Sequence, residues 1–137
     1  MIESTPAIRR YTRSVMLLSV AYALILFGTV GFFRDHPRIS DVTAYAIAAL
    51  PALPIIGIIM VIGRYLIEER DEYLRMLMAR QALIATGITL SIATLWGFIE
   101  DVGLAPHIPA YHVAVLWFAG FGVGALVNKL LERRGAA

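Results

Sequence analysis

Four apolar runs, each about twenty residues or longer, limit what this chain can fold into. They cover residues 15–33, 42–67, 76–99 and 110–131. A helix needs about 20 mainly apolar residues to cross a hydrocarbon core about 30 Å thick, because each residue rises about 1.5 Å. A strand of a membrane barrel has only about ten alternating residues, so these runs favour helices. We therefore predict an all-α integral membrane four-helix bundle, formed by a single transmembrane domain over residues 1–137.

The composition supports a membrane location. Hydrophobic residues make up 59% of the chain and charged residues 16%, whereas soluble domains carry about 45–50% and about 25%. A domain of 137 residues has too small a core to hide such a surplus, which argues against a soluble enzyme. The absence of cysteine from the sequence excludes disulfides, thiolate metal sites, iron–sulfur clusters and cysteine nucleophiles. The net charge of +2 gives no indication of nucleic-acid binding.

The basic residues predict an orientation. Ten of the 12 lysines and arginines lie in the two terminal tails, in the connection between the second and third runs, or just inside the third run; the other two lie in the first connection. Cytoplasmic segments carry the excess of Lys and Arg. We therefore expect both termini and the middle connection to be cytoplasmic. Because the connections are short, we expect neighbouring helices to be antiparallel. The ten residues are Arg9, Arg10, Arg13, Arg64, Arg70, Arg75, Arg80, Lys129, Arg133 and Arg134.

Capping residues and prolines mark the expected ends and bends of the helices. Ser40 or Asp41 is suited to cap the second helix, and Pro109 suits the first turn of the fourth. Pro51 and Pro54 lie near the start of the second run. They remove backbone donors there and predict a kink that serves packing.

Small side chains repeat along the third and fourth runs. In lipid, helices associate through close packing along such residues, so these positions are predicted to face neighbouring helices. Gly120 and Gly124 form a GxxxG pair, which serves either dimerisation of two copies or packing inside one bundle. The predicted packing positions are Ala82, Thr86, Thr89, Ala93, Gly97, Gly120 and Gly124.

The connection between the second and third runs carries the densest group of charges. One interpretation is a solvated helix end that docks a partner; the alternative is a divalent-cation site, although interleaved arginines partly neutralise the carboxylates. The residues concerned are Glu68, Glu69, Asp71, Glu72 and Arg75. Arg80 and Gln81 lie one turn inside the third run, where Arg80 is expected to snorkel to the interface or to pair with a carboxylate of this connection.

The segments EERDEYLRMLMARQALIATGITL (residues 68–90) and TLWGFIEDVG (residues 94–103) carry a resemblance. They resemble a group of small, uncharacterised bacterial inner-membrane proteins with a DE-aromatic-x-R element before the third span. The resemblance covers about the last two-thirds of the chain. It implies a bacterial source and a four-span fold, and it implies no activity.

The expected extracytoplasmic side carries histidines and acids. Imidazoles and carboxylates bind Zn²⁺ and other transition metals, so one alternative is a metal or haem redox module. No pair of these residues has the i,i+4 spacing of a helical metal site, so we expect no resident cofactor. The residues of this alternative are His107, His112, Glu100 and Asp101.

Three function classes follow from these observations. No serine–histidine arrangement, phosphate loop or metalloprotease motif appears in the sequence, so we expect no enzyme activity. The preferred hypothesis is a non-enzymatic accessory, scaffolding or assembly subunit, in contact with membrane lipid and in a homo-oligomer or a larger membrane complex. The alternative is a small homo-oligomeric transporter or channel, although none of the ten acids lies inside a predicted span. The redox module is the third hypothesis.

Overall fold

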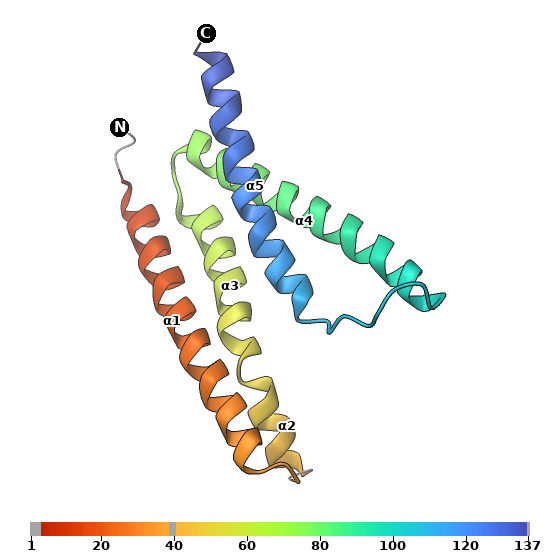
Figure 1. Cartoon of the computed structure of the whole chain (residues 1–137). Coiled ribbons are helices and arrows are strands. Elements are labelled where there is room, and N and C mark those ends of the chain that lie inside the picture. The colour runs from red at the N-terminus through yellow and green to blue at the C-terminus, as the bar shows by residue number, and fades with distance from the viewer. Residues whose placement is uncertain (1–3, 39–40, 137) are drawn as a thin grey trace. The chain divides into compact units, whose positions relative to one another are not determined.

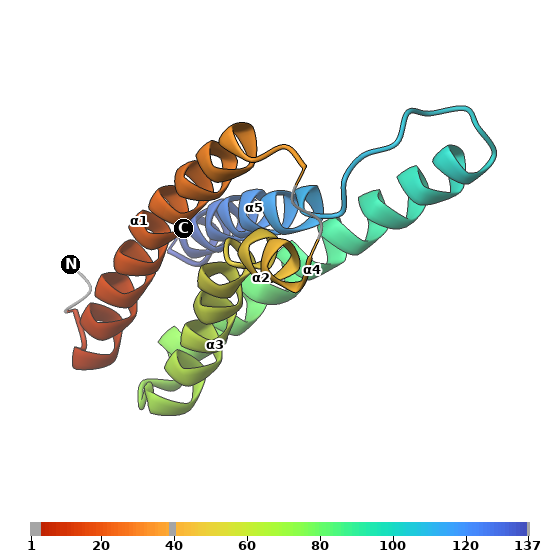
Figure 2. The same ribbon diagram turned by 90° about the horizontal axis from the view of Figure 1, so that it is seen from below.

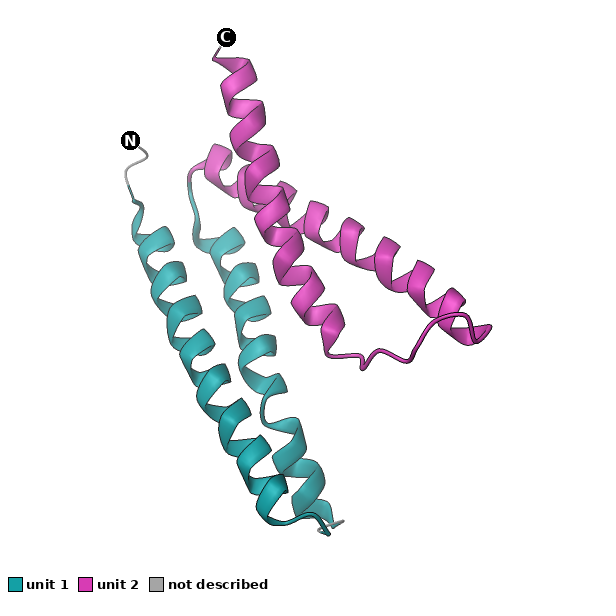
Figure 3. Ribbon diagram, in the orientation of Figure 1, with its two compact units in different colours: residues 1–70 teal, residues 71–137 magenta. Residues whose placement is uncertain are grey.

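The computed structural model describes residues 4–38 and 41–136, which form five helices and no strand. Figure 1 shows the helices in chain order. They divide into two compact units (Figure 3). We call Met1–Arg70 the N-terminal hairpin and Asp71–Ala137 the C-terminal hairpin. The helices are α1 (Pro6–Asp35), α2 (Val42–Ala49), α3 (Ala52–Glu68), α4 (Glu72–Asp101) and α5 (His112–Gly135).

The lengths and compositions of the helices agree with a multi-pass membrane protein. Three of them (α1, α4 and α5) are long and apolar enough to cross a membrane. The pair α2 and α3 also passes this test when it is taken as one bent span. The prediction of an all-α chain is confirmed, with three or four candidate spans.

The predicted second span is broken into two helices at its first proline. The axes of α2 and α3 differ by 43°, and the break falls at Leu50 and Pro51. Pro51 has no amide to bond the carbonyl of Ile47, which accepts instead from Leu50 N at 3.2 Å. Pro54 causes no second break, because it lies in the first turn of α3, where its missing N–H would have no intrahelical partner.

In the N-terminal hairpin, α1 packs along one face of α3. The buried positions of α3 recur every three or four residues, as the contact face of a helix does. Gly57 leaves room for Leu18 of α1, whose methyl carbon would lie 3.2 Å from a Cβ at the glycine. Near the open end, the rings of Tyr11 and Tyr65 pack with their centroids 5.3 Å apart. The buried residues of α3 are Pro54, Ile58, Ile62 and Tyr65.

In the C-terminal hairpin, α4 and α5 approach closely at two glycines. A Cβ at Gly120 would lie 2.8 Å from the Ala85 Cα atom, and a Cβ at Gly124 would lie 2.9 Å from the Gln81 Cα atom. Both distances are shorter than van der Waals contact, so only glycine permits this backbone approach. The GxxxG pair of the sequence therefore faces α4 of the same chain.

Side chains cap three helices at their N-termini. The Thr5 hydroxyl accepts from Ile8 N, an Asp41 oxygen accepts from Ala44 N, and Asp71 accepts from the amides of the first turn of α4. Asp41 is therefore a cap of α2, whereas Ser40 lies outside the described residues. The fourth predicted span begins as a helix only at His112, because residues 109–111 form a turn before α5.

Candidate functional site

Polar side chains bond α4 to α5 near the close glycine contacts. The Trp117 indole N–H donates to the Thr86 hydroxyl (3.0 Å), which itself donates to the Ala82 carbonyl (2.8 Å). The Gln81 amide donates to the Phe121 carbonyl at 2.9 Å. Such bonds between membrane helices contribute about 0.6 kcal/mol each on average. Together with the glycines, they hold one half of the hairpin closed.

The other half of the C-terminal hairpin is open. Figure 1 shows α4 and α5 diverging toward their connection, and Figure 2 shows that connection arching away from both helices. The space between the diverging helices is a groove of about 510 Å³. We call it the α4–α5 groove. Its volume lies within the range of small-molecule sites.

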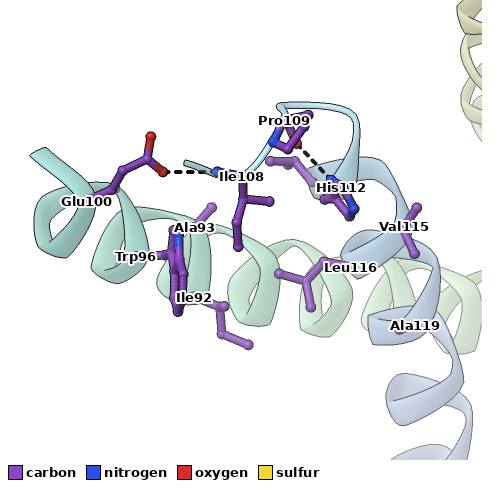
Figure 4. A pocket seen from close by; sticks show the side chains of 12 residues that line it. Ile92, Ala93, Trp96, Glu100, Ile108, Pro109, His112, Val115, Leu116 and Ala119 are labelled. Atoms are coloured by element: carbon purple, nitrogen blue, oxygen red, sulfur yellow. Dashed lines mark hydrogen bonds between the residues drawn. The ribbon is translucent and has the colours of Figure 1, made fainter. Parts of the chain in front are cut away.

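The α4–α5 groove has apolar walls and one acidic residue. Figure 4 shows Trp96 of α4, Ile108 of the connection and Leu116 of α5 around the same space. Several small residues lie between these larger ones. The lining residues are Ile92, Ala93, Trp96, Gly97, Glu100, Ile108, Pro109, His112, Val113, Val115, Leu116 and Ala119.

A carboxylate and an imidazole form a pair at the mouth of the groove. His107 Nδ1 lies 2.6 Å from Glu100 Oε1, and Ile108 N donates to Glu100 Oε2 at 3.4 Å. Glu100 follows the predicted span of residues 76–99. The hydrogen bond from His107 holds the pKa of the Glu100 carboxyl below its usual value, aided by the bond from Ile108 and opposed by partial desolvation. This bond also ties the connection to the end of α4.

The rings of His112 and Trp96 also line the groove, and they differ in their hydrogen bonding. His112 Nδ1 donates to the Pro109 carbonyl at 3.1 Å, which closes the turn before α5. The Trp96 indole nitrogen is buried, and no acceptor among the described residues meets hydrogen-bond geometry with it. Trp96 lies one helical turn before Glu100, and it makes a small contribution to the lowered pKa of the Glu100 carboxyl. The i,i+4 spacing of Trp96 and Glu100 places both side chains on one face of α4, but no pattern in the sequence indicates that the groove opens there.

The structure pairs only two members of the suggested metal set. Glu100 and His107 are hydrogen-bonded to each other, while Nδ1 of His112 donates to the Pro109 carbonyl. Among residues 4–38 and 41–136, no group of three or more His, Asp or Glu side chains is arranged to hold a metal ion. Asp101 is exposed at the C-terminal end of α4. Glu100 and His107 together offer two metal-binding groups, and the His107 side chain is largely exposed. Two such groups are a weak basis for a structural metal site.

The small residues of α4 fall into two groups. Thr89 is buried, Thr86 is bonded to Trp117, and Ala82 supplies the carbonyl that accepts from Thr86. Ala93 and Gly97 lie farther along the helix, where they line the α4–α5 groove. A Cβ at Gly97 would meet no atom within 4 Å. The first group is therefore covered by α5, and the second faces open space.

Two acids of the proposed docking segment have structural roles in the N-terminal hairpin. Glu69 is only 3% exposed and accepts a 2.6 Å hydrogen bond from the Thr5 hydroxyl. Glu68 forms ion pairs with Arg10 (3.1 Å) and with Arg64 (3.5 Å). The contacts of Thr5 and Arg10 join the beginning of α1 to the end of α3, whereas the pair of Arg64 and Glu68 lies within α3.

The remaining members of the segment lie in the C-terminal hairpin. Asp71 caps α4 by accepting from Tyr73 N and Leu74 N. Glu72 and Arg75 are exposed and border a shallow depression on the first turns of α4. Of the five residues, these last two are the ones best placed to meet a partner without disturbing the hairpins.

No protein-family model, curated protein or solved structure matches the chain. The resemblance to small bacterial inner-membrane proteins therefore remains a prediction from the sequence. The function has to be inferred from the groove and the surfaces described above.

Proposed function

We propose that this chain is a non-enzymatic accessory or assembly subunit of a membrane complex, and that the α4–α5 groove receives a transmembrane helix of a distinct partner protein. The proposal also includes a bacterial inner-membrane location with both termini cytoplasmic. Glu72 and Arg75 would add contacts to the partner outside the lipid.

The uncovered part of the small-residue stripe carries this proposal. Toward one end of α4, small residues allow α5 to approach to backbone contact at Gly120 and Gly124. Toward the other end, Ala93 and Gly97 line the apolar groove and have no such neighbour in the hairpin. Small residues in membrane helices serve close helix packing, since lipid tails give little drive for apolar association. A partner helix in the groove would use Ala93 and Gly97 in the same way.

Site-specific photo-crosslinking in native membranes tests the occupant of the groove. A photoreactive residue at Ala93 is expected to capture a distinct membrane protein. Leu83 is the matched control, because it lies on α4, is 73% exposed and does not line the groove. The probe at Leu83 is expected to capture lipid.

Two other results would count against an accessory subunit. If the probe at Ala93 captured only other segments of the same polypeptide, the groove would be filled by the chain itself. If it captured a second copy of this chain, a homo-oligomer would replace the distinct partner. Purification in mild detergent from native membranes, with mass spectrometry and an absorption spectrum of the sample, would identify the partner and would also reveal a coloured cofactor.

The orientation has its own test. The sequence contains no cysteine, so a single introduced thiol can be labelled without background. Ala136→Cys is expected to react with a membrane-impermeant maleimide only after the membrane is opened, whereas Ala105→Cys is expected to react in intact cells. The reverse pattern would place both termini outside.

A second candidate function is a homo-oligomeric transporter for lipophilic cations. The observation that favours it is the Trp96 indole beside the Glu100 carboxylate in an apolar groove, since aromatic faces and carboxylates both attract organic cations. Binding of tetraphenylphosphonium, measured by quenching of tryptophan fluorescence, would support this function if Glu100→Gln abolished it. A sample that binds no cation and retains a stoichiometric partner would support the accessory subunit.

A further inference from the structure

A second pocket lies between α4 and α5 at the opposite end of the C-terminal hairpin. Its volume is about 430 Å³. It lies beside the first turns of α4 and the last turns of α5, and we call it the Arg80 pocket. Its lining residues are Tyr73, Met76, Leu77, Arg80, Asn128, Leu131, Glu132 and Gly135.

A basic side chain, that of Arg80, lines the pocket. Among the described residues, Arg80 forms no ion pair, and its one hydrogen bond is a long contact of 3.9 Å to the Met76 sulfur. Of the two alternatives for Arg80, snorkelling to the interface or pairing with a carboxylate of the adjacent connection, the pairing is therefore not seen. A guanidinium with open donors binds phosphate well, because its planar fork matches two phosphate oxygens.

An unsatisfied acceptor lies in the same pocket. Asn128 is only 7% exposed. Its amide nitrogen donates to the Leu77 carbonyl at 3.0 Å, while its side-chain oxygen is buried without a partner among the described residues. A buried acceptor without a donor costs free energy. Because this oxygen is closed to solvent, a ligand in the pocket does not reach it while the side chain keeps this position.

The pocket also contains one carboxylate. Glu132 accepts from the Tyr73 hydroxyl at 2.8 Å through one of its oxygens. The pocket thus presents a cation and an anion between two helices that are long and apolar enough to be membrane spans. A zwitterionic group with a phosphate at one end and a primary ammonium at the other complements both.

We propose that the Arg80 pocket binds the headgroup of phosphatidylethanolamine, with the phosphate on Arg80 and the ammonium on Glu132. This inference uses the membrane location but not the accessory role proposed above. Phosphatidylcholine has the same phosphate but no N–H donor, and phosphatidylglycerol has hydroxyl donors but no positive charge. Both lipids therefore lack one of the complementary groups.

Native mass spectrometry of the full chain, released from detergent in the presence of each lipid, tests this assignment. The lipids that are compared carry the same acyl chains. Phosphatidylethanolamine is expected to stay bound in preference to phosphatidylcholine and phosphatidylglycerol. Arg80→Gln is expected to weaken binding about tenfold or more, since the neutral amide loses the charge-assisted hydrogen bonds to the phosphate. Glu132→Gln, which keeps an acceptor for Tyr73, is expected to remove the preference over the other two lipids.

Arg75→Gln is the matched control, because Arg75 lies near the same end of α4 but does not line the pocket. An equal loss from Arg75→Gln and Arg80→Gln would overturn the proposal, because it would indicate general attraction of lipid phosphates to a basic helix end. Equal retention of phosphatidylcholine would overturn it too, as would preferential retention of phosphatidylglycerol. Because Arg80 and Glu132 are away from the groove, these results do not depend on whether a partner helix is found there.

Discussion

Gly124 of α5 lies directly against Gln81 of α4. A Cβ at Gly124 would be 2.9 Å from both the Cα atom and the carbonyl oxygen of Gln81. The Gln81 side chain also donates to the Phe121 carbonyl, one turn earlier on α5. One residue of α4 therefore provides both the surface that requires a glycine and a hydrogen bond that fixes the position of α5.

Substitution of this glycine is expected to destabilise the C-terminal hairpin. In Gly124→Ala, the added methyl group would push against backbone atoms, which cannot rotate away as a side chain can. Overpacking of this kind costs about 1–3 kcal/mol. Thermal unfolding in mild detergent, followed by tryptophan fluorescence, measures the loss.

Gly122→Ala is the matched control on the same helix. A Cβ at Gly122 would meet nothing within 4 Å, and alanine has the higher helix propensity. Gly122→Ala is therefore expected to leave the unfolding temperature unchanged or slightly raised. Equal destabilisation by both substitutions would show that the glycines act through the helix itself and not through the contact with α4.

The sequence predicted the helices better than their arrangement. Apolar length and basic flanks indicate spans because the hydrocarbon core imposes both requirements. The prolines indicated a bend, but not that the second span would divide into two helices. The GxxxG spacing of Gly120 and Gly124 is the same for a dimer of two copies and for a contact inside one chain. The sequence therefore does not decide which helix these glycines face.

The candidate site was harder to predict. The α4–α5 groove depends on where two helices diverge, and no local pattern encodes the angle between them. Glu100 and His107 were identified as candidate ligands, whereas their pairing depends on the path of the connection. Glu69 was predicted to be exposed with its neighbours, yet it is buried at the end of α3. Its hydrogen-bond partner Thr5 lies 64 residues away in the sequence, so no local pattern indicates this burial.

The burial of Glu69 predicts unequal effects within the charged segment. Glu69→Ala would leave the Thr5 hydroxyl without its carboxylate acceptor and is expected to destabilise the N-terminal hairpin by about 1–3 kcal/mol. Hydrogen exchange of the amides in the last turns of α3 measures this effect. Glu72→Ala, at an exposed position, is expected to stay within about 0.5 kcal/mol of the unmodified chain. Loss of a bound partner from Glu72→Ala without a change in exchange would support docking at this residue.

Pro51 lies at the break between α2 and α3. Pro51→Ala restores an amide that can bond the Ile47 carbonyl, so the 43° bend is expected to decrease. Spin labels on cysteines at Tyr45 and Met60, which are both exposed, are expected to move apart in the variant. Pro54→Ala is the control, because an N–H in the first turn of α3 has no intrahelical acceptor. A similar change from both substitutions would show that the packing of α3 against α1, and not the missing amide, sets the bend.

The bond between His107 and Glu100 predicts how the connection responds to pH. Because the pKa of Glu100 is lowered in the folded chain, folding is favoured above the ordinary pKa of a glutamate. This contribution is lost as the pH falls through the lowered value, where the carboxylate takes up a proton. Carbon NMR of the Glu100 carboxyl is expected to show a lower titration midpoint in the unmodified chain than in His107→Phe. Equal midpoints would mean that the Ile108 amide and Trp96, not His107, set the acidity of this group.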